Sequence, residues 1–391
     1  MGRYSLGTYN KRWNESMFEH QDALSELNQQ ISLKEKLVAA HKTLQEKFPF
    51  VARIAITIYD PETKVLKTYI HSSGDDNPIQ NYQALLEDAP SLKEILKRGR
   101  PRVVNNLVTF EDSSKEHAQR IGRQGYAASY TMPIFYCGEF FGFMFFNSYD
   151  KNVFSEKVLN DIDVFGHLIS LIIVNELSVV KILGGAVKTS TQMAHLRDPE
   201  TGSHLDRMSR YSRLIANKLA SKYDLDDEYI EHVFMFAPLH DIGKIAIPDN
   251  ILLKPGPLDD EEREIMRTHA DKGQTMIDDM VQNFGLGNIN RIHILRNIAG
   301  YHHEAVNGTG YPEGKRQNEI PLEARIVAVA DVFDALTSSR SYKEAWSNEK
   351  AINTLQELAG EKLDEDCVQA LINSTSEILE IQQRFKETPY D

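Results

Sequence analysis

Histidine and carboxylate residues in the second half of this sequence have the types and the spacing that metal binding requires. The set comprises Glu200, His204, His240, Asp241, His269, His302, His303 and Asp331. Glu200 and His204 are four residues apart, so both side chains can project from one face of a helix. Imidazole and carboxylate ligands suit divalent zinc, iron, manganese or nickel, and the absence of cysteine from the set argues against a zinc finger.

Asp331 is the most informative single residue of the set. It lies in the segment 326–333, which is apolar on all sides and therefore predicts a buried helix. A buried carboxylate is costly unless it is paired or bound to a cation, so a metal ion would explain Asp331. A neighbouring arginine or a helix end would explain it equally well when Asp331 is taken alone.

The joint pattern is stronger than any one of its members. A single histidine, such as His232, is more often a structural residue than a ligand. Here the candidates fall on successive helices and exceed the needs of one ion, so we expect at least two metal ions. Two ions a few ångströms apart serve in-line attack on phosphorus, where one activates water and both neutralise charge on the phosphoryl oxygens.

The elements that must position these residues are helices. Asp198 and Pro199 have the N-cap and first-turn chemistry of a helix start. Further helices are predicted at Asp227–Ala237, Asp259–Gln282, Ile292–Tyr301, Pro321–Leu336, Lys350–Leu358 and Asp364–Glu380. Since no strand signal of comparable quality appears there, the second half is predicted to be all-α.

The first half has a different periodicity, which predicts an α+β domain flanked by helices. Residues 1–50 have helical spacing, whereas the apolar residues of Val51–Tyr59 and Val65–Ile70 predict two strands. The remaining predicted elements are a helix at Ser91–Lys97, a hairpin of Ser129–Tyr136 and Glu139–Ser148 joined at Cys137-Gly138, and a long helix from Phe154 to Val180.

Composition excludes several classes of protein. The chain has 391 residues, a formal net charge of −13 and 26% charged residues, which indicates a globular protein and argues against a duplex nucleic-acid partner. The cysteines Cys137 and Cys367 lie far apart, so a reducing cytoplasm is the expected compartment. No apolar run approaches the roughly 18 residues of a membrane span, and the N-terminus has no signal-peptide pattern.

The motifs of the second half resemble those of the HD-GYP family of phosphodiesterases. They are RDPETGSH at 197–204, HDIGKIAIPD at 240–249, LKPG at 253–256, HHE at 302–304, GTGYP at 308–312, ADVFDAL at 330–336 and RSYK at 340–343. The resemblance covers about residues 185–355 in order. Asn307 departs from the pattern, because the family usually has aspartate before the first loop glycine, but asparagine keeps the turn geometry.

Carried over by position, this resemblance implies a role for each residue of the centre. The eight candidates named first would be the metal ligands, with Asp241 bridging two ions and Glu200 allowing a third. The cofactor is accordingly expected to be two or three divalent ions, iron or manganese. The residues that contact phosphate and base would be Lys244, Tyr311, Arg340 and Lys343. Without the motif, each of these three cations would be read as a solvated surface residue.

The first half resembles a GAF domain, the small-ligand sensor module. The resemblance rests on the hairpin YTMPIF at 130–135 and GEFFG at 138–142, followed by the helix opening FSE at 154–156. The expected organisation is an N-terminal helical segment at 1–24, a GAF-like α+β domain with an antiparallel sheet at 25–178 and an all-α HD-GYP domain at 179–391. The GAF-like domain would bind a small ligand that the sequence does not identify, or would mediate homodimerisation.

The resemblance implies hydrolysis of cyclic di-GMP to linear pGpG under the control of the GAF-like domain, and it leaves open whether hydrolysis continues to GMP. Within the enzymes, the alternative substrate is cyclic GMP-AMP or another cyclic dinucleotide, because the motifs read phosphate better than base. An alternative of another class is a non-catalytic signalling module that binds a partner through the loop Gly308–Pro312. The filled ligand positions favour the enzyme.

Overall fold

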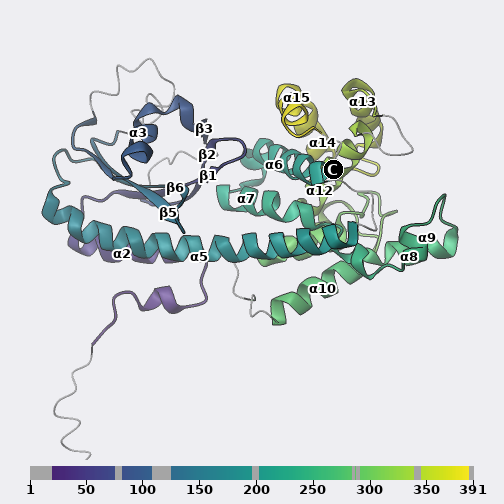
Figure 1. The fold of residues 1–391 in the computed structure, drawn as a ribbon, viewed down its shortest axis with the longest axis horizontal. Coiled ribbons are helices and arrows are strands. Elements are labelled where there is room, and N and C mark those ends of the chain that lie inside the picture. Colours follow the sequence, from purple (N-terminus) through teal and green to yellow (C-terminus); the bar gives the residue numbers. More distant parts are fainter. Residues whose placement is uncertain are drawn as a thin grey trace, which may run out of the picture.

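The computed structural model describes residues 20–74, 82–107, 125–195, 202–283, 287, 291–338 and 345–386. The chain forms a sheet-containing part followed by a helical part, and one long helix, α5 (Glu156–His195), runs beneath both (Figure 1). The fold class predicted from the sequence, an α+β domain with an antiparallel sheet and then an all-α domain, is confirmed.

The sheet of the first part has six antiparallel strands in the order β3-β2-β1-β6-β5-β4. The predicted hairpin is present, and its strands pair from Ala128 with Ser148 to Tyr136 with Glu139. The turn at Cys137 and Gly138 has positive φ at both residues, which is the geometry of a tight hairpin turn. The strands are β1 (Arg53–Asp60), β2 (Val65–Ser73), β3 (Gln83–Leu85), β4 (Arg102–Val104), β5 (Ala128–Tyr136) and β6 (Glu139–Ser148).

Helices cover both faces of the sheet. On one face α2 (Leu33–Lys47) and α5 pack against the sheet through apolar side chains that include Ile56, Met144 and Phe146. On the other face α3 (Pro90–Arg98) packs on Leu66 and Phe143. Alternate residues of the strands thus fill two separate cores, as the pleat of a strand requires.

The helical part surrounds one large core. Its helices are α6 (Gly202–Tyr223), α7 (Asp227–Phe236), α8 (Asp249–Leu252), α9 (Asp260–Arg267), α10 (His269–Asn283), α11 (Ile292–Tyr301), α12 (Leu322–Thr337), α13 (Asn348–Leu358), α14 (Glu365–Ile372) and α15 (Thr375–Arg384). Short 3-10 turns η4 (Ala237–Leu239) and η5 (Ile242–Ala246) follow α7. Most of α12 is buried, as its apolar sequence predicts.

Three stretches predicted as single helices are interrupted. The stretch predicted at Asp259–Gln282 is split between α9 and α10, where the Thr268 hydroxyl donates a hydrogen bond to the Ile265 carbonyl and competes with the helical pattern. The last predicted helix is split after Ile372 into α14 and α15. Of residues 1–50, the described part forms a short 3-10 turn and then α2, because Ser32 and Glu35 make a capping box that starts a new helix.

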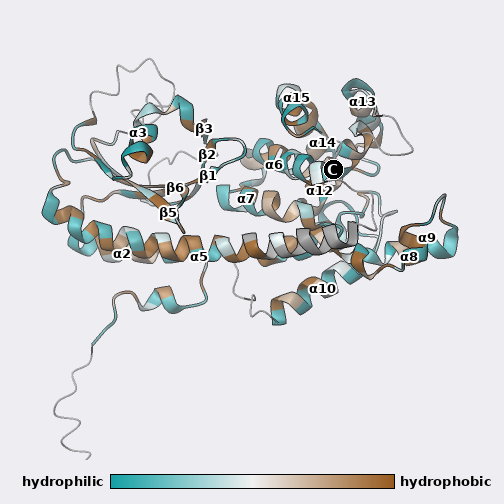
Figure 2. Cartoon of the chain, in the orientation of Figure 1, coloured by the Kyte–Doolittle hydropathy of each residue, from teal (hydrophilic) through white to brown (hydrophobic). Residues whose placement is uncertain are grey.

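Helix α5 is apolar enough to be compared with a membrane span. Its segment Glu156–Val180 has the length and apolar composition to cross a bilayer. Within the most apolar stretch of this segment, 33% of the residues are buried in the protein. Figure 2 shows apolar residues along α5 where it faces the sheet and α2. Ile162, Ile169 and Ile173 are buried there. The core helix of a folded domain can have the same length and apolar composition, so these two features do not identify α5 as a membrane span.

The two parts of the chain meet at a cluster of buried charges. Lys67 of β2 is 3% exposed and its Nζ lies 3.4 Å from Asp60 Oδ2 and 3.5 Å from Glu231 Oε1 of α7. Arg210 of α6 contacts Asp60 with its Nη1 at 3.2 Å, and Arg213 approaches Glu231 at 3.6 Å. The turn between β1 and β2 is therefore joined to the same helix that carries His204.

We expect Asp60→Ala to destabilise the protein by about 3 kcal/mol or more, because it leaves the buried cations of this cluster short of a counter-charge. Burial alone would raise the pKa of Asp60, but Lys67 and Arg210 hold that pKa below its ordinary value. Since the folded-state pKa is depressed, this stabilisation is present at neutral pH and is lost as the pH falls.

Urea unfolding at pH 7 measures the effect. Asp161→Ala is the matched control, because Asp161 pairs with Lys47 at 2.8 Å on the surface, with side chains 40% and 59% exposed. That control should cost less than about 1 kcal/mol. Equal stability of the two variants would contradict the buried-cluster interpretation.

Candidate metal centre

Asp241 and His240 are positioned by the short turns that follow α7. The turn η5 packs directly on α10 because Gly243 has no side chain, and a Cβ atom there would lie 1.9 Å from the carbonyl oxygen of His269. This close approach brings Asp241, at the start of η5, against His269, at the start of α10. The glycine of the sequence HDIG is thus required by packing at the centre.

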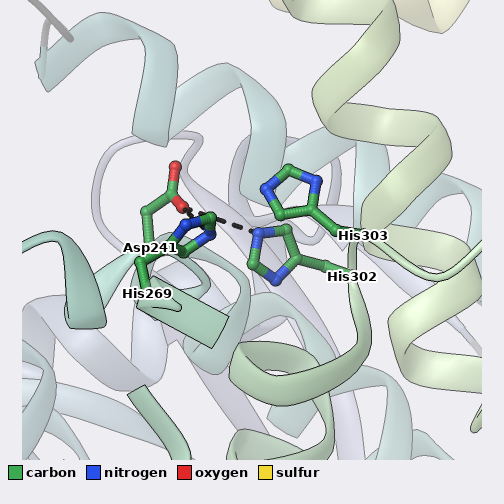
Figure 3. Close-up of side chains that lie close together, drawn as sticks. All are labelled: Asp241, His269, His302 and His303. Atoms are coloured by element: carbon green, nitrogen blue, oxygen red, sulfur yellow. Dashed lines mark ion pairs between the residues drawn. The ribbon is translucent and has the colours of Figure 1, made fainter. Parts of the chain in front are cut away.

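Asp241, His269, His302 and His303 form the first group of ligand atoms, which lie within 4.8 Å of one another (Figure 3). His269 Nε2 is 3.1 Å and His302 Nε2 is 3.5 Å from Asp241 Oδ1. These three buried atoms have no hydrogen-bond partner among the described residues. Buried acceptors that converge without a donor are stabilised by a cation, so this donor set fits a metal ion.

His204, His240 and Asp331 form a second group, also within 4.8 Å of one another. His204 Nε2 lies 3.7 Å from Asp331 Oδ1, and the rings of His204 and His240 are 6.2 Å apart. The groups meet at Asp241, whose Oδ2 is 3.1 Å from His240 Nε2 while its Oδ1 faces the first group. One carboxylate therefore presents an oxygen to each group, as a bridging ligand does.

The ring orientation of these histidines is determined by hydrogen bonds at Nδ1. His240 Nδ1 lies 3.0 Å from the Ala237 carbonyl, His269 Nδ1 lies 2.8 Å from the Met266 carbonyl and His302 Nδ1 lies 2.9 Å from the Ile298 carbonyl. Since a carbonyl only accepts, Nδ1 carries the proton and Nε2 presents its lone pair to the centre. Metal-binding histidines are oriented in this way.

His204 is oriented by a buried carboxylate that the sequence interpretation did not assign. Its Nδ1 lies 2.8 Å from Asp334 Oδ2. Arg207 donates to both oxygens of Asp334, at 2.7 and 3.0 Å, and Ser338 donates a further bond at 2.9 Å. The signal was present, because Asp334 follows Asp331 by one helical turn in the same apolar helix.

Burial and neighbouring charges shift the pKa of three of the proposed ligands toward the form that binds a cation. Burial lowers the pKa of His302, and burial together with the neighbouring His302 lowers the pKa of His303 well below its ordinary value. Burial would raise the pKa of Asp241, but Lys244 and His240 hold it well below its usual range. Lys244 Nζ lies 2.8 Å from Asp241 Oδ2, so this cation borders the centre.

The loop at 304–316 places Tyr311 beside the histidines. Buried Glu304 accepts hydrogen bonds from the backbone of Glu313 at 2.8 Å and Lys315 at 3.0 Å. Gly310 lies so close to Glu304 and Ala305 that a Cβ atom would be 2.2 Å from the Ala305 nitrogen. The ring of Tyr311 stacks on His303 with centroids 4.7 Å apart, so the loop forms a wall of the centre.

The described residues account for most of the predicted centre. The structure brings together seven of the predicted ligands, namely His204, His240, Asp241, His269, His302, His303 and Asp331. It also places Lys244 and Tyr311 next to them. Glu200, Arg340 and Lys343 lie outside the described residues, as do Asp198 and Pro199.

A helical domain with two linked groups of buried and partly buried histidine and carboxylate residues is typical of proteins that bind metal ions, and the chain was compared with known proteins of this kind. Residues 190–367 match the family model described as HD domain. The second half of the chain is therefore similar to HD domains, which agrees with the resemblance stated from its motifs.

Relatives with named activities match about half of the chain. The cyclic di-GMP phosphodiesterase response regulator RpfG of Xanthomonas campestris pv. campestris is 43% identical over 189 residues, which are 48% of this chain and 47% of that protein. A cyclic di-GMP phosphodiesterase of Thermotoga maritima is 36% identical over 50% of each chain. The 3'3'-cGAMP-specific phosphodiesterase 2 of Vibrio cholerae is 36% identical over 47% of this chain and 33% of that protein. The chain thus spans half or less of the length of these relatives.

Solved structures that match part of the chain include GAF domains. One is the phycocyanobilin-bound GAF domain from a cyanobacterial phytochrome, with a TM-score of 0.31, 15% identity and coverage of 44% of this chain and 96% of that chain. Another is the GAF domain from Acinetobacter phosphoenolpyruvate-protein phosphotransferase, with a TM-score of 0.31, 16% identity and coverage of 40% and 91%. The bilin of the first structure is a ligand of that protein.

Proposed function

We propose that this protein is a metal-dependent phosphodiesterase that opens cyclic di-GMP to linear pGpG and then hydrolyses it to GMP. The observation that carries the proposal is the pair of ligand groups joined at Asp241. Divalent ions held there would supply an activated water and neutralise charge on the phosphoryl oxygens. Relatives at 36–43% identity that are named cyclic di-GMP phosphodiesterases support this substrate class.

Each described side chain has a separate task in this proposal. His204, His240 and Asp331 would hold one ion, and His269, His302 and His303 would hold another, with Asp241 available to both. Lys244, which borders Asp241, donates to the phosphate as its negative charge develops. Tyr311, whose ring borders His303, contacts the substrate at the wall of the centre.

The motif residues outside the described part complete the proposal. Glu200 would allow a third ion, so that two or three divalent ions are bound, and iron or manganese are the metals we propose. Arg340 and Lys343 would donate to the dinucleotide. The alternative substrate is cyclic GMP-AMP, which the names of some relatives favour. A non-catalytic signalling module that binds a partner at Gly308–Pro312 is the alternative outside the enzymes.

The first half is proposed to regulate the second. We assign residues 1–24 to an N-terminal segment, 25–178 to the GAF-like sensor of a small ligand and 179–391 to the phosphodiesterase domain. Val164, Leu171 and Ile182 of α5 are 67%, 68% and 69% exposed, and this apolar stripe supports a homodimer. A cytoplasmic location is proposed on the two free cysteines, Cys137 and Cys367.

Lys244→Ala should lower kcat/KM for cyclic di-GMP by about tenfold to a hundredfold, the effect of losing one charged hydrogen bond of roughly 1.5–3 kcal/mol. The bound metal should remain, because Lys244 is not a ligand in this proposal. Turnover measured by separation of nucleotides, with metal analysis of the same sample, checks both statements.

Lys272→Ala is the matched control for this prediction. Lys272 also borders η5, where its Nζ donates to the Ala246 carbonyl at 3.0 Å, but it is not part of the ligand groups. It should turn over substrate within about twofold of the unmodified protein. Full activity of Lys244→Ala would remove Lys244 from the proposed mechanism.

A further inference from the structure

Arg267 lies at the edge of the centre and has no role in the function proposed so far. It is the last residue of α9, and α8 and α9 project from the helical part beside α10 (Figure 1). The guanidinium carbon of Arg267 lies over the ring of Tyr311, 5.3 Å from its centroid. A cation over an aromatic face is stabilised by the ring, so this contact gives Arg267 a definite position.

Arg267 contacts Tyr311, which in turn contacts two of the proposed metal ligands, His303 and His269. The ring of His303 stacks on Tyr311 at 4.7 Å, and His269 lies edge-on to Tyr311 at 6.2 Å. Tyr311 is held in turn by its backbone nitrogen, which donates to the His303 carbonyl at 3.2 Å. Arg267 is therefore separated from a proposed metal ligand by one aromatic ring, so it lies beside the centre rather than in it.

The geometry points to a particular ligand chemistry. A planar guanidinium can donate two parallel hydrogen bonds to O6 and N7 of guanine, whereas adenine presents a donor, its amino group, in place of O6. Glu264 engages Nη1 of Arg267, at 2.6 Å on the surface, and the remaining N–H groups are chemically able to make that pair.

We propose that Arg267 determines base specificity by binding the O6 and N7 edge of one guanine of the substrate. This inference rests on the proposed function and deepens it, because it names a residue that distinguishes guanine-containing from adenine-containing cyclic dinucleotides. Tyr311 is the support that positions the guanidinium.

The chain supplies a matched control on the same helix. Arg263 lies one turn before Arg267 and is similarly exposed, at 53% against 45%. Both arginines form an ion pair with a carboxylate three residues earlier, Arg263 with Asp260 at 3.1 Å and Arg267 with Glu264 at 2.6 Å. Arg263 donates a second hydrogen bond to the Leu258 carbonyl, at 2.9 Å, just before the start of α9. The feature that distinguishes Arg267 from Arg263 is therefore its contact with the ring of Tyr311.

The test compares kcat/KM for cyclic di-GMP and cyclic di-AMP in metal-loaded protein. Arg267→Ala should reduce the preference for cyclic di-GMP by about tenfold to a hundredfold, the discrimination carried by one bidentate arginine–guanine pair. The loss should fall mainly on KM for cyclic di-GMP, while metal content stays unchanged. Arg267→Lys should restore little of the preference, because an ammonium group cannot make the bidentate pair. Arg263→Ala should leave the preference unchanged.

Several outcomes would overturn the proposal. An equal loss on both substrates would assign Arg267 to phosphate, and full rescue by lysine would reduce its role to charge alone. If the unmodified protein opens neither compound, the proposed function is wrong, and calorimetric binding of the same two compounds then decides on Arg267. A guanine preference in binding that Arg267→Ala removes supports the inference, and the absence of such a preference contradicts it.

Discussion

Asp241→Ala should abolish hydrolysis of cyclic dinucleotides and lower the metal content of the protein. The two oxygens of Asp241 face different ligand groups, with Oδ1 3.1 Å from His269 Nε2 and Oδ2 3.1 Å from His240 Nε2. Removal of this carboxylate takes one ligand from each group and the shared charge from between the ions. Because metal ions carry the chemistry of such centres, we expect a loss of more than about a thousandfold in kcat.

The measurement is turnover of cyclic di-GMP together with metal analysis and a far-ultraviolet circular dichroism spectrum of the same sample. The helical spectrum should be retained, since Asp241 is not part of the helical core. Asp271→Ala, an exposed carboxylate on α10, is the control and should behave as the unmodified protein. Activity of Asp241→Ala within about tenfold of the unmodified protein would be incompatible with a bridging role.

Among these substitutions, Asp334→Ala should cause the largest loss in the free energy of unfolding. Asp334 is fully buried, at 0% exposure, and it is the partner of both His204 and Arg207, which are 4% and 5% exposed. Burial alone would raise the pKa of Asp334, but hydrogen bonds from His204 and Arg207 hold that pKa below its ordinary value. Removing the carboxylate leaves a buried guanidinium without its counter-charge, which typically costs about 3–5 kcal/mol.

The same substitution should weaken the metal group that contains His204. Loss of a carboxylate that orients a histidine ligand lowers metal affinity by roughly tenfold to a hundredfold. Urea unfolding of metal-free protein measures the first effect, and metal titration measures the second. Asp334→Asn keeps the shape of the side chain and should retain a folded protein with weakened metal binding.

A surface pair provides the comparison for Asp334. Asp366 binds Lys222 at 2.6 Å, where the two side chains are 34% and 60% exposed, so Asp366→Ala should cost less than about 1 kcal/mol. If Asp334→Ala were as mild as Asp366→Ala and bound its full complement of metal, the orienting role of Asp334 would be excluded.

The sequence was sufficient to predict much of this architecture because local chemistry and global fold agree. The hairpin at Cys137 and Gly138 is predicted by its turn residues and alternating strands, and it lies where the turn was expected. The helix that carries Asp331 is predicted by its continuous apolar sequence, and most of it is buried, although the side chain of Asp331 itself is 23% exposed. Strong periodicity leaves few alternatives for such segments.

The remainder depends on contacts that no local pattern contains. The break at Thr268 arises from a side-chain bond to a backbone carbonyl, which competes with a sequence of good helix formers. The pairing of Arg207 with Asp334 joins residues 127 positions apart, and the contact of Arg210 with Asp60 joins residues 150 apart. Helix periodicity predicts that such side chains are buried but does not identify their partners.

The central claim is that a multinuclear metal centre in this chain hydrolyses a cyclic dinucleotide, and a metal titration of turnover tests it most directly. Metal-free protein would be reconstituted anaerobically with increasing iron or manganese, and hydrolysis of cyclic di-GMP would be measured at each bound stoichiometry. The proposed function predicts that activity requires at least two bound ions per chain and produces pGpG. Full activity at one bound ion or none, or no hydrolysis at any loading, would contradict it.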